Sequence, residues 1–331
     1  MMSLSDFLGE WQNVNPTILV HTSGSTGKPK PLMVEKQRME SSARITCQFL
    51  GLHKGDTALL CMPLDYIAGK MMVVRALTCG LRLISVEPSG HPLSMLSSPI
   101  DFAAMVPLQV YNSLQVPEER ERLRQIRHLI IGGGAVDDAM AEALKDFPNA
   151  VWSTYGMTET LSHIALRRLN GAERSDWYTP FAGVQLKLND DGCLVIDAPA
   201  VHEGVLVTND IAELSPDGRS FRILGRKDNV ICSGGVKIQI EEVEQLLRST
   251  LSTPFMVSKR PDPKFGEAVV LLTEGSPDAA RRACIAVLPK HWQPRHYLHV
   301  DRLPMTETGK PARRQAQQLA ETGAGEGYPS R

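Results

Sequence analysis

The sequence predicts an α/β protein with two domains, and three observations lead to this prediction. In the first half of the 331 residues, apolar strand-like runs alternate with helical stretches, which predicts a mixed, largely parallel sheet covered by helices. From Gly183 onward, apolar and polar residues alternate around Asp-Gly turns, which indicates antiparallel hairpins. After Arg226, a shorter succession of helices and strands predicts a small α+β domain. We place the two domains at residues 1–227 and 228–331.

The individual elements follow from hydrophobic periodicity and from turn residues. The predicted strands of the first half are TILVH, TALLCM, RLISV, HLII and AVWSTYG. A helix with apolar positions Met39, Ala43, Cys47 and Leu50 ends at Gly51, and further helices cover residues 68–79 and 137–147. In the small domain we expect helices at 240–249 and 278–288 and strands in FMVSK, AVVLLT and YLHV.

Composition excludes several classes of protein. With 42% hydrophobic and 22% charged residues and a formal net charge of −1, no overall field indicates nucleic acid or an anionic membrane as a partner. No apolar run reaches the roughly 20 residues that span a bilayer. The first residues lack the pattern of a secretory signal, and the six cysteines form no C-x-x-C pair, so we expect a cytoplasmic protein with reduced thiols.

The segment HTSGSTGKPK directly follows the first apolar strand and is the most unusual stretch of the chain. Glycines allow backbone N–H groups to approach an anion, and hydroxyls and lysines add hydrogen-bond donors and positive charge. A phosphate-binding loop is one interpretation, and a flexible surface turn is the other. The spacing argues against a Walker loop, because Gly24 and Gly27 are too close together and Pro29 follows Lys28.

Five motifs in order resemble the adenylate-forming superfamily, which includes acyl- and aryl-CoA synthetases, peptide-synthetase adenylation domains and luciferases. They are TSGSTGKPK at 22–30, STYGMTET at 153–160, TND at 208–210, LGRKDNVICSGGVKIQIEEVE at 224–244 and TETGKPAR at 306–313. The resemblance therefore covers most of the chain. It implies that ATP and a carboxylic acid form an acyl-adenylate, with Mg²⁺ as the metal, and that coenzyme A then displaces AMP.

The resemblance also implies a nucleotide site. Its residues are Thr22, Ser23, Gly24, Ser25, Thr26, Gly27 and Lys30 at the phosphates, Gly133, Gly134, Ser153, Thr154, Tyr155 and Gly156 near the adenine, and Asp210 and Arg226 at the ribose. Thr158 is implied to contact the α-phosphate, and Glu159 to bind Mg²⁺, which prefers carboxylate oxygens. The alternatives are structural: a helix cap for Glu159, a core role for Tyr155 and turn roles for the glycines and Asp210.

Lys310 is implied to be the catalytic lysine of the small domain. Its compact charge can bridge the carboxylate and the α-phosphate as they meet, whereas the alternative is a solvated lysine in a surface loop. Asp228 resembles the hinge about which the small domain rotates, and Gly234 and Gly235 resemble the loop that lines the path of the thiol. The alternative for Asp228 is a turn aspartate.

The chain departs from the family pattern in two places. Family members usually carry more residues before the phosphate loop, so we expect an adenylate-forming fold with a shortened N-terminal region. An apolar face exposed by such a deletion would favour self-association into a homo-oligomer. In MPLDYIAG, Tyr66 stands where the family usually has histidine, which weakens the transfer of a gating role.

Within the superfamily, the compact plan and YGMTETLSHIAL most resemble the o-succinylbenzoate–CoA ligases of menaquinone biosynthesis. We expect Tyr66, Lys70, Arg75 and Ser162 to surround the acid, with Lys70 and Arg75 neutralising a second carboxylate. Arg75 could equally be a solvated helix charge. The alternatives for the function are another short aryl- or acyl-CoA ligase, or a degenerate nucleotide-binding protein without catalysis.

Overall fold

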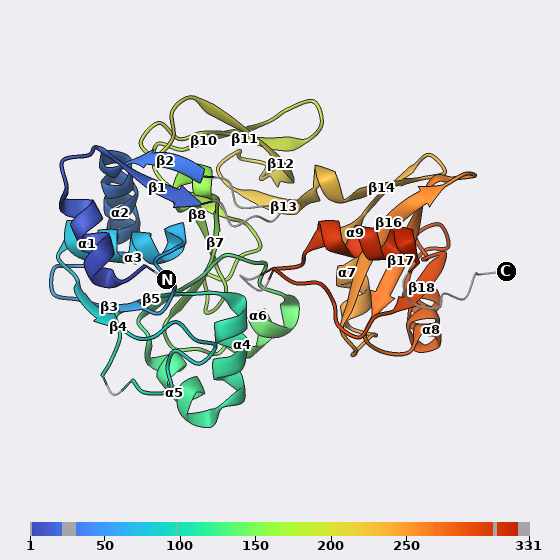
Figure 1. Cartoon of the computed structure of the whole chain (residues 1–331), viewed down its shortest axis with the longest axis horizontal. Coiled ribbons are helices and arrows are strands. Elements are labelled where there is room, and N and C mark those ends of the chain that lie inside the picture. Colours follow the sequence, from blue (N-terminus) through green and yellow to red (C-terminus); the bar gives the residue numbers. More distant parts are fainter. Residues whose placement is uncertain (1, 22–30, 97, 307–309, 324–331) are drawn as a thin grey trace.

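The structure of the protein, a computed structural model, describes residues 2–21, 31–96, 98–306 and 310–323. Figure 1 shows a large lobe that contains the N-terminal elements and a smaller lobe formed by the C-terminal ones. Among the described residues, no helix combines the length and apolarity that a membrane crossing requires.

A seven-stranded sheet forms the centre of the large lobe. Its spatial order is β4 (Arg82–Ser85), β3 (Thr57–Leu60), β5 (Phe102–Met105), β6 (His128–Ile131), β7 (Ala150–Gly156), β8 (His163–Arg168) and β9 (Thr179–Pro180). The first five strands are parallel, and β8 and β9 are added antiparallel. Ligands of open α/β sheets bind outside the carboxyl ends of the parallel strands, which here places the predicted YGMTE motif at the expected edge.

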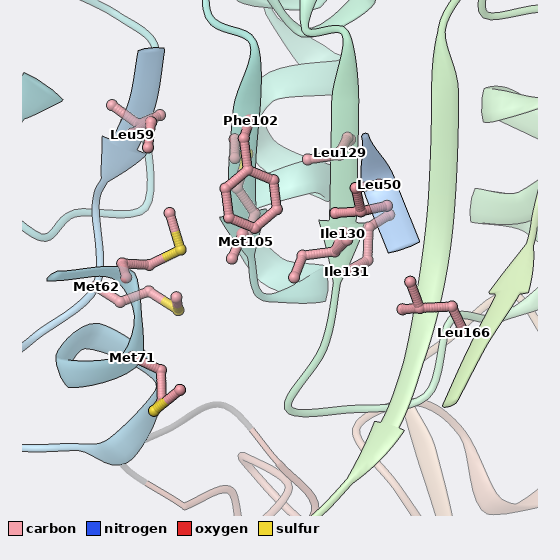
Figure 2. Packing of buried hydrophobic residues seen from close by; sticks show 14 of the residues in the cluster. Leu50, Leu59, Met62, Met71, Phe102, Met105, Leu129, Ile130, Ile131 and Leu166 are labelled. Carbon is pink, nitrogen blue, oxygen red and sulfur yellow. The ribbon is translucent and has the colours of Figure 1, made fainter. Parts of the chain in front are cut away.

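Within the described residues, six α-helices belong to this lobe. They are α1 (Leu4–Gln12), α2 (Lys36–Leu50), α3 (Ile67–Cys79), α4 (Pro107–Gln115), α5 (Pro117–Gln125) and α6 (Asp138–Leu144). The four apolar positions predicted for α2 are all buried, and Gly51 ends the helix in the left-handed conformation with φ +63°. Leu59 of β3, Phe102 of β5 and Ile130 of β6 belong to one apolar cluster with Leu50 of α2 (Figure 2).

The first strand was expected in the parallel sheet, and this prediction is wrong. β1 (Thr17–His21) pairs antiparallel with β2 (Pro31–Glu35) in a separate two-stranded sheet, with His21 opposite Pro31. A parallel connection needs about a dozen or more residues, and residues 22–30 are too few. The hairpins expected after Gly183 are confirmed: β10 (Gln185–Leu188), β11 (Cys193–Asp197), β12 (Val205–Leu214) and β13 (Phe221–Arg226) form an antiparallel sheet.

The small lobe has its own sheet and its own apolar clusters. The sheet contains β14 (Val230–Ser233), β15 (Val236–Gln239), β16 (Phe255–Asp262), β17 (Gly266–Thr273) and β18 (His296–His299). The helices are α7 (Ile240–Arg248), α8 (Pro277–Val287) and α9 (Arg313–Thr322). Among the residues that the structure describes, the apolar clusters of this lobe share no member with that of the large lobe. The boundary between residues 227 and 228 stays a prediction.

Candidate functional site

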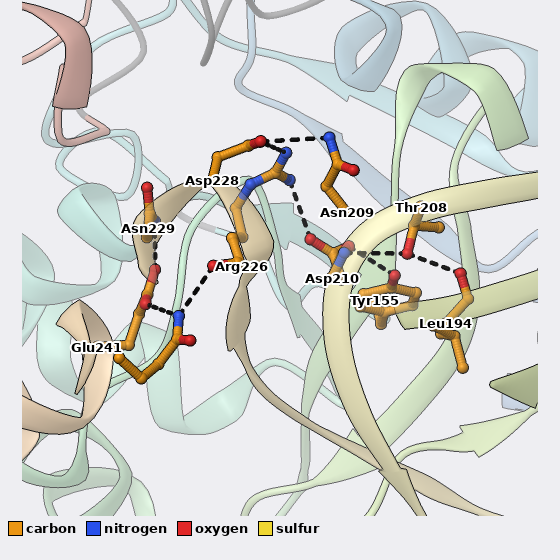
Figure 3. Close-up of polar contacts among 10 residues, drawn as sticks. Tyr155, Leu194, Thr208, Asn209, Asp210, Arg226, Asp228, Asn229 and Glu241 are labelled. Carbon is orange, nitrogen blue, oxygen red and sulfur yellow. Dashed lines mark hydrogen bonds and ion pairs between the residues drawn. The ribbon is translucent and has the colours of Figure 1, made fainter. Parts of the chain in front are cut away.

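Two predicted nucleotide residues, Tyr155 and Arg226, donate hydrogen bonds to the carboxylate of a third, Asp210. The Tyr155 hydroxyl donates to Oδ2 of Asp210 at 2.7 Å, and Nη1 of Arg226 donates to Oδ1 at 2.9 Å (Figure 3). Asp210 and Arg226 are opposite each other on β12 and β13, while Tyr155 lies near the carboxyl end of β7. Both carboxylate oxygens are therefore held by donors from two other strands.

The ring of Tyr155 is fixed by aromatic neighbours. Its centroid lies 5.0 Å from that of Phe221 in an edge-to-face arrangement and 6.0 Å from that of Tyr178. Burial and the adjacent Asp210 raise the pKa of Tyr155, so its hydroxyl remains a hydrogen-bond donor at neutral pH. The aromatic cluster thus fixes the direction in which this hydroxyl reaches Asp210.

Arg226 also links the site to the start of the small lobe. Its Nη2 donates to Oδ2 of Asp228 at 3.1 Å, and Asn209 donates to the same oxygen at 3.3 Å. Burial opposes the positive charge, but Asp210 and Asp228 outweigh it and raise the pKa of Arg226. The carbonyl of Arg226 accepts a hydrogen bond from the side chain of Gln239, which ends β15. The predicted hinge residue is therefore directly bonded to the predicted ribose site.

Glycines border the site where backbone segments approach closely. A Cβ on Gly156 would lie 2.3 Å from the carbonyl oxygen of Ser162, so β7 and the following segment could not pack there with another residue. A Cβ on Gly132 would lie 2.4 Å from Oγ1 of Thr154. The exposed Gly133 has φ +79°, a left-handed conformation that favours glycine. The predicted glycine segment and the predicted STYG segment thus lie side by side at one edge of the sheet.

Thr158 and Glu159 lie in the short 3₁₀ helix η1 (Thr158–Thr160), directly after β7. Thr158 is buried and Glu159 is half-buried, and the carbonyl of Glu159 lies 3.0 Å from Nδ1 of His202. Within the described part of the chain, no group of three or more His, Cys, Asp or Glu side chains could hold a metal ion. A single carboxylate fits Mg²⁺ that is bound mainly through nucleotide phosphates and water.

Lys310 is half-buried and lies near the charge of Arg226. Burial, together with the positive charge of Arg226, lowers the pKa of Lys310. Its backbone N–H donates to Oγ1 of Thr306 at 3.0 Å, and its carbonyl accepts from the N–H of Thr306 at 2.7 Å. The lysine of the C-terminal segment therefore lies close enough to Arg226 for their two positive charges to interact.

A second polar cluster lies beside the same edge of the sheet. Nη2 of Arg75, on α3, donates to Oγ of Ser162 at 2.6 Å, and the Arg75 side chain is fully buried. No described aspartate or glutamate forms an ion pair with Arg75, and its Nε has no hydrogen-bond partner among the described residues. Burial lowers the pKa of Arg75 to about 10, although the guanidinium is still charged at neutral pH.

The other residues predicted for the acid are arranged differently. The prediction that Lys70 acts together with Arg75 finds no support in the geometry. Nζ of Lys70 lies 3.1 Å from Sδ of Met2, 3.9 Å from a carboxylate oxygen of Glu10 and over the ring of Phe7, so it faces α1. Tyr66 precedes α3 and is half-buried. The structure therefore brings together Arg75 and Ser162 and directs Lys70 elsewhere.

Sequence reasoning missed His163 and Thr46, which continue the cluster beyond Ser162. Nδ1 of His163 lies 3.1 Å from Oγ of Ser162, and Nε2 lies 3.2 Å from Oγ1 of Thr46. Thr46 lies between Ala43 and Cys47 on the apolar face of α2, and a polar residue in such a stripe was the available signal.

The phosphate loop predicted at Thr22–Lys30 lies outside the described residues.

Comparison with known proteins identifies the class. Residues 9–209 match the family described as AMP-binding enzyme, and the chain belongs to this family. This confirms the resemblance inferred from the five ordered motifs.

Individual relatives show which members of the family the chain is similar to. The chain is 34% identical to the acyl-CoA synthetase (AMP-forming)/AMP-acid ligase II-like protein of Dyadobacter fermentans DSM 18053, with a TM-score of 0.64 over 94% of this chain and 91% of that one. It is 25% identical to the 2-succinylbenzoate–CoA ligase of Bacillus thuringiensis subsp. konkukian, covering 92% of this chain and 70% of that ligase. It also resembles the o-succinylbenzoate CoA synthetase of Bacillus subtilis in complex with its acyl-adenylate intermediate, at 25% identity and a TM-score of 0.76 over 90% and 68% of the two chains.

Proposed function

We propose that this protein is an AMP-forming acid–CoA ligase whose acid is o-succinylbenzoate. The observation that carries the proposal is the hydrogen-bonded network of Tyr155, Asp210 and Arg226, three predicted nucleotide residues from separate motifs, with Lys310 near enough for the charge of Arg226 to lower its pKa. The names of the relatives supply the reaction class and the acid.

The first half-reaction joins the acid to AMP. A carboxylate oxygen attacks the α-phosphorus of ATP, and the bond between this phosphorus and the bridging oxygen to the β-phosphate breaks as pyrophosphate leaves. Lys310 stabilises the negative charge shared by the carboxylate and the α-phosphate, which is electrostatic catalysis. Asp210 accepts hydrogen bonds from the ribose hydroxyls while Tyr155 and Arg226 hold its carboxylate in place. Thr158 donates to the α-phosphate.

Glu159 is the residue that would bind Mg²⁺ together with the phosphates of ATP. The ion would neutralise charge on the departing pyrophosphate. Residues Thr22–Lys30 are assigned to the β- and γ-phosphates on the motif alone.

The second half-reaction transfers the acyl group. The sulfur of coenzyme A attacks the acyl carbon, and AMP leaves with the oxygen that linked it to that carbon. We assign Asp228 as the hinge for the change between the two half-reactions. Its carboxylate is exposed and bonds Arg226 and Asn209, contacts that a rotation of the small lobe would break and remake. Gly234 and Gly235 form the turn between β14 and β15 with φ values of +58° and +82°, and we assign this turn to the path of the thiol.

The identity of the acid rests on Arg75 as well as on the relatives. A buried guanidinium is costly unless an anion neutralises it, and Arg75 has no such partner among the described residues. Gly156 and His163 are opposite each other on β7 and β8, so Ser162 and Arg75 lie next to the YGMTE segment where the acid would meet ATP. o-Succinylbenzoate carries a second carboxylate that can neutralise Arg75.

The proposal is tested by acid-dependent exchange of labelled pyrophosphate into ATP. The acids compared are o-succinylbenzoate, 3-benzoylpropionate, which lacks the second carboxylate, benzoate, malonate and a medium-chain fatty acid. We expect the highest kcat/KM with o-succinylbenzoate and no exchange without acid. Coenzyme A added to the active acid should give a thioester and AMP.

Two other results identify the alternatives. Efficient exchange with a different acid and not with o-succinylbenzoate would retain the reaction and reject the substrate. ATP binding without exchange for any acid would reject the enzyme and favour a nucleotide-binding protein.

A further inference from the structure

The hydrogen bonds around His163 have one consistent direction. Oγ1 of Thr46 lies 3.0 Å from the carbonyl oxygen of Ser42, one turn earlier on α2. A carbonyl can only accept a hydrogen bond, so the single hydroxyl proton of Thr46 is used there. Toward His163, Oγ1 of Thr46 can then only accept, and the contact of 3.2 Å requires a proton on Nε2.

The other side of the imidazole follows from this assignment. In a neutral ring with Nε2 protonated, Nδ1 is an acceptor. Ser162, whose Oγ is 3.1 Å away, must therefore donate its proton to Nδ1. The Ser162 oxygen then presents lone pairs to Nη2 of Arg75 at 2.6 Å. The direction runs from Arg75 through Ser162 to His163, and from His163 through Thr46 to Ser42.

We propose that His163 is a positioning residue that holds Ser162 as a fixed acceptor, so that Arg75 keeps one orientation toward the second carboxylate of the acid. The inference rests on the proposed function for the identity of that carboxylate. Ser162 engages one N–H of the guanidinium and Sδ of Met72 lies 3.8 Å from Nη1, while Nε lacks a partner within the described part of the chain. We call the chain of hydrogen bonds from Arg75 through Ser162, His163 and Thr46 to Ser42 the relay. It orients Arg75 without neutralising its charge.

The surroundings keep His163 in the neutral form that the relay requires. The side chain is buried, and the ring of Phe181 packs against it edge to face with centroids 5.4 Å apart. Burial and the positive charge of Arg75 lower the pKa of His163 well below its ordinary value. An imidazolium would put a proton on Nδ1, which would turn the Ser162 proton away from His163 and toward Arg75.

The first test is the protonation state of the ring, observed by ¹⁵N NMR of the full chain labelled at histidine. The spectrum of His163→Gln assigns the signal among the nine histidines. We expect a neutral imidazole with its proton on Nε2 at pH 7. A proton on Nδ1, or an imidazolium, would overturn the relay whatever acid the enzyme uses.

The second test is pyrophosphate exchange with o-succinylbenzoate and 3-benzoylpropionate. Leu at position 163 can neither accept from Ser162 nor donate to Thr46, whereas Gln can do both. We expect His163→Leu to raise the KM for o-succinylbenzoate by about tenfold, the cost of about one hydrogen bond, with the KM for 3-benzoylpropionate unchanged. With His163→Gln, the KM for o-succinylbenzoate should return most of the way to the wild-type value. Thr46→Val should raise this KM by part of the effect of His163→Leu, whereas Thr46→Ser should leave it near the wild-type value.

The control is Thr57→Val, which removes an equally buried hydroxyl at the amino end of β3. It should leave the ratio of the two KM values unchanged. The positioning role is overturned if His163→Leu changes both acids equally, or if His163→Gln is as impaired as His163→Leu. If the wild type gives no exchange with any acid, the proposed function fails and the NMR assignment alone decides the relay.

Discussion

The two polar clusters at the carboxyl edge of the sheet differ in how their positive charge is balanced. In the Tyr155–Asp210–Arg226 cluster, a carboxylate lies 2.9 Å from the guanidinium and a second one, Asp228, lies 3.1 Å away. In the Arg75–Ser162–His163 cluster, no described carboxylate pairs with the guanidinium, and its hydrogen-bond and ring contacts are a serine, a methionine sulfur and a phenylalanine ring. The first cluster is complete within the protein, whereas the second lacks an anion.

This difference indicates that the two clusters have different functions. A charge that is already paired positions a ligand through hydrogen bonds, and its geometry does not depend on the ligand being present. An unpaired buried cation makes the folded protein less stable and is neutralised only by an anionic ligand. We therefore expect the first cluster to govern reaction and nucleotide binding, and the second to govern the choice of acid.

The largest effect should come from the lysine that approaches the first cluster. Lys310→Ala should lower adenylate formation by about 10³-fold, the upper range for loss of one electrostatic group, while thioester formation from preformed adenylate stays near wild type. Single-turnover assays of each half-reaction measure the two effects. Lys290→Ala, an exposed lysine of the same lobe, is the control. Equal losses in both half-reactions would contradict the assignment.

In the absence of ligands, substitutions in the two arginine clusters should change the free energy of unfolding in opposite directions. Arg75→Met replaces an unpaired buried cation by an apolar side chain and should raise the free energy of unfolding by about 1–4 kcal/mol. Asp210→Ala leaves Arg226 and Tyr155 without their shared acceptor and should lower it by about 1–3 kcal/mol. Urea titrations of both variants test the comparison. A destabilised Arg75→Met protein would mean that the second cluster is also complete.

His163 should make the stability of the second cluster depend on pH. Because the pKa of folded His163 lies well below 6.5, the unfolded chain binds a proton near pH 6.5 that the folded protein does not. Stability is therefore lost as the pH falls, by about 1.4 kcal/mol between pH 7.5 and 5.5 for this group. Between the same two pH values, the free energy of unfolding of His163→Gln should fall by about 1.4 kcal/mol less than that of the wild type. His291→Gln, at an exposed position, should behave like wild type.

The smallest effect should come from the hydroxyl of Tyr155. Tyr155→Phe removes one of the two described donors to the Asp210 carboxylate while the ring and the Arg226 contact remain. We expect the KM for ATP to rise by about fivefold, since a single net hydrogen bond contributes about 1 kcal/mol. Initial-rate kinetics with varied ATP measure it. If only the KM for the acid changed, Tyr155 would act on the acid, and its assignment to the nucleotide cluster would be wrong.

The family resemblance implied the first cluster as one nucleotide site, whereas for the second cluster the sequence led to Arg75 and Ser162 but not to His163. The motifs around Tyr155, Asp210 and Arg226 are contiguous, and their order along the chain predicted one nucleotide site. The second cluster joins α2, α3 and β8, and its hydrogen-bond directions depend on a packing that no local pattern contains. Lys70 illustrates this limit. It is five residues from Arg75, which on a helix of 100° per residue turns the two side chains about 140° apart.

The fold was predicted well where periodicity is strong. The four-residue apolar run FAAM, which forms β5, is too short to distinguish a strand from a helix. Helix α5, PEERERLRQ, buries only Glu119 and Leu123 and so has no apolar stripe. Both segments were missed, because their structure depends on contacts with the rest of the lobe.

The most direct test of the central claim is a thermodynamic cycle between Arg75 and the second carboxylate. It compares kcat/KM for pyrophosphate exchange in wild type and Arg75→Met, with o-succinylbenzoate and 3-benzoylpropionate. We predict a coupling free energy of about 2 kcal/mol or more, as found for buried charge pairs. A coupling below about 0.5 kcal/mol, the limit for independent sites, would show that the acid does not supply the missing anion and would contradict the account.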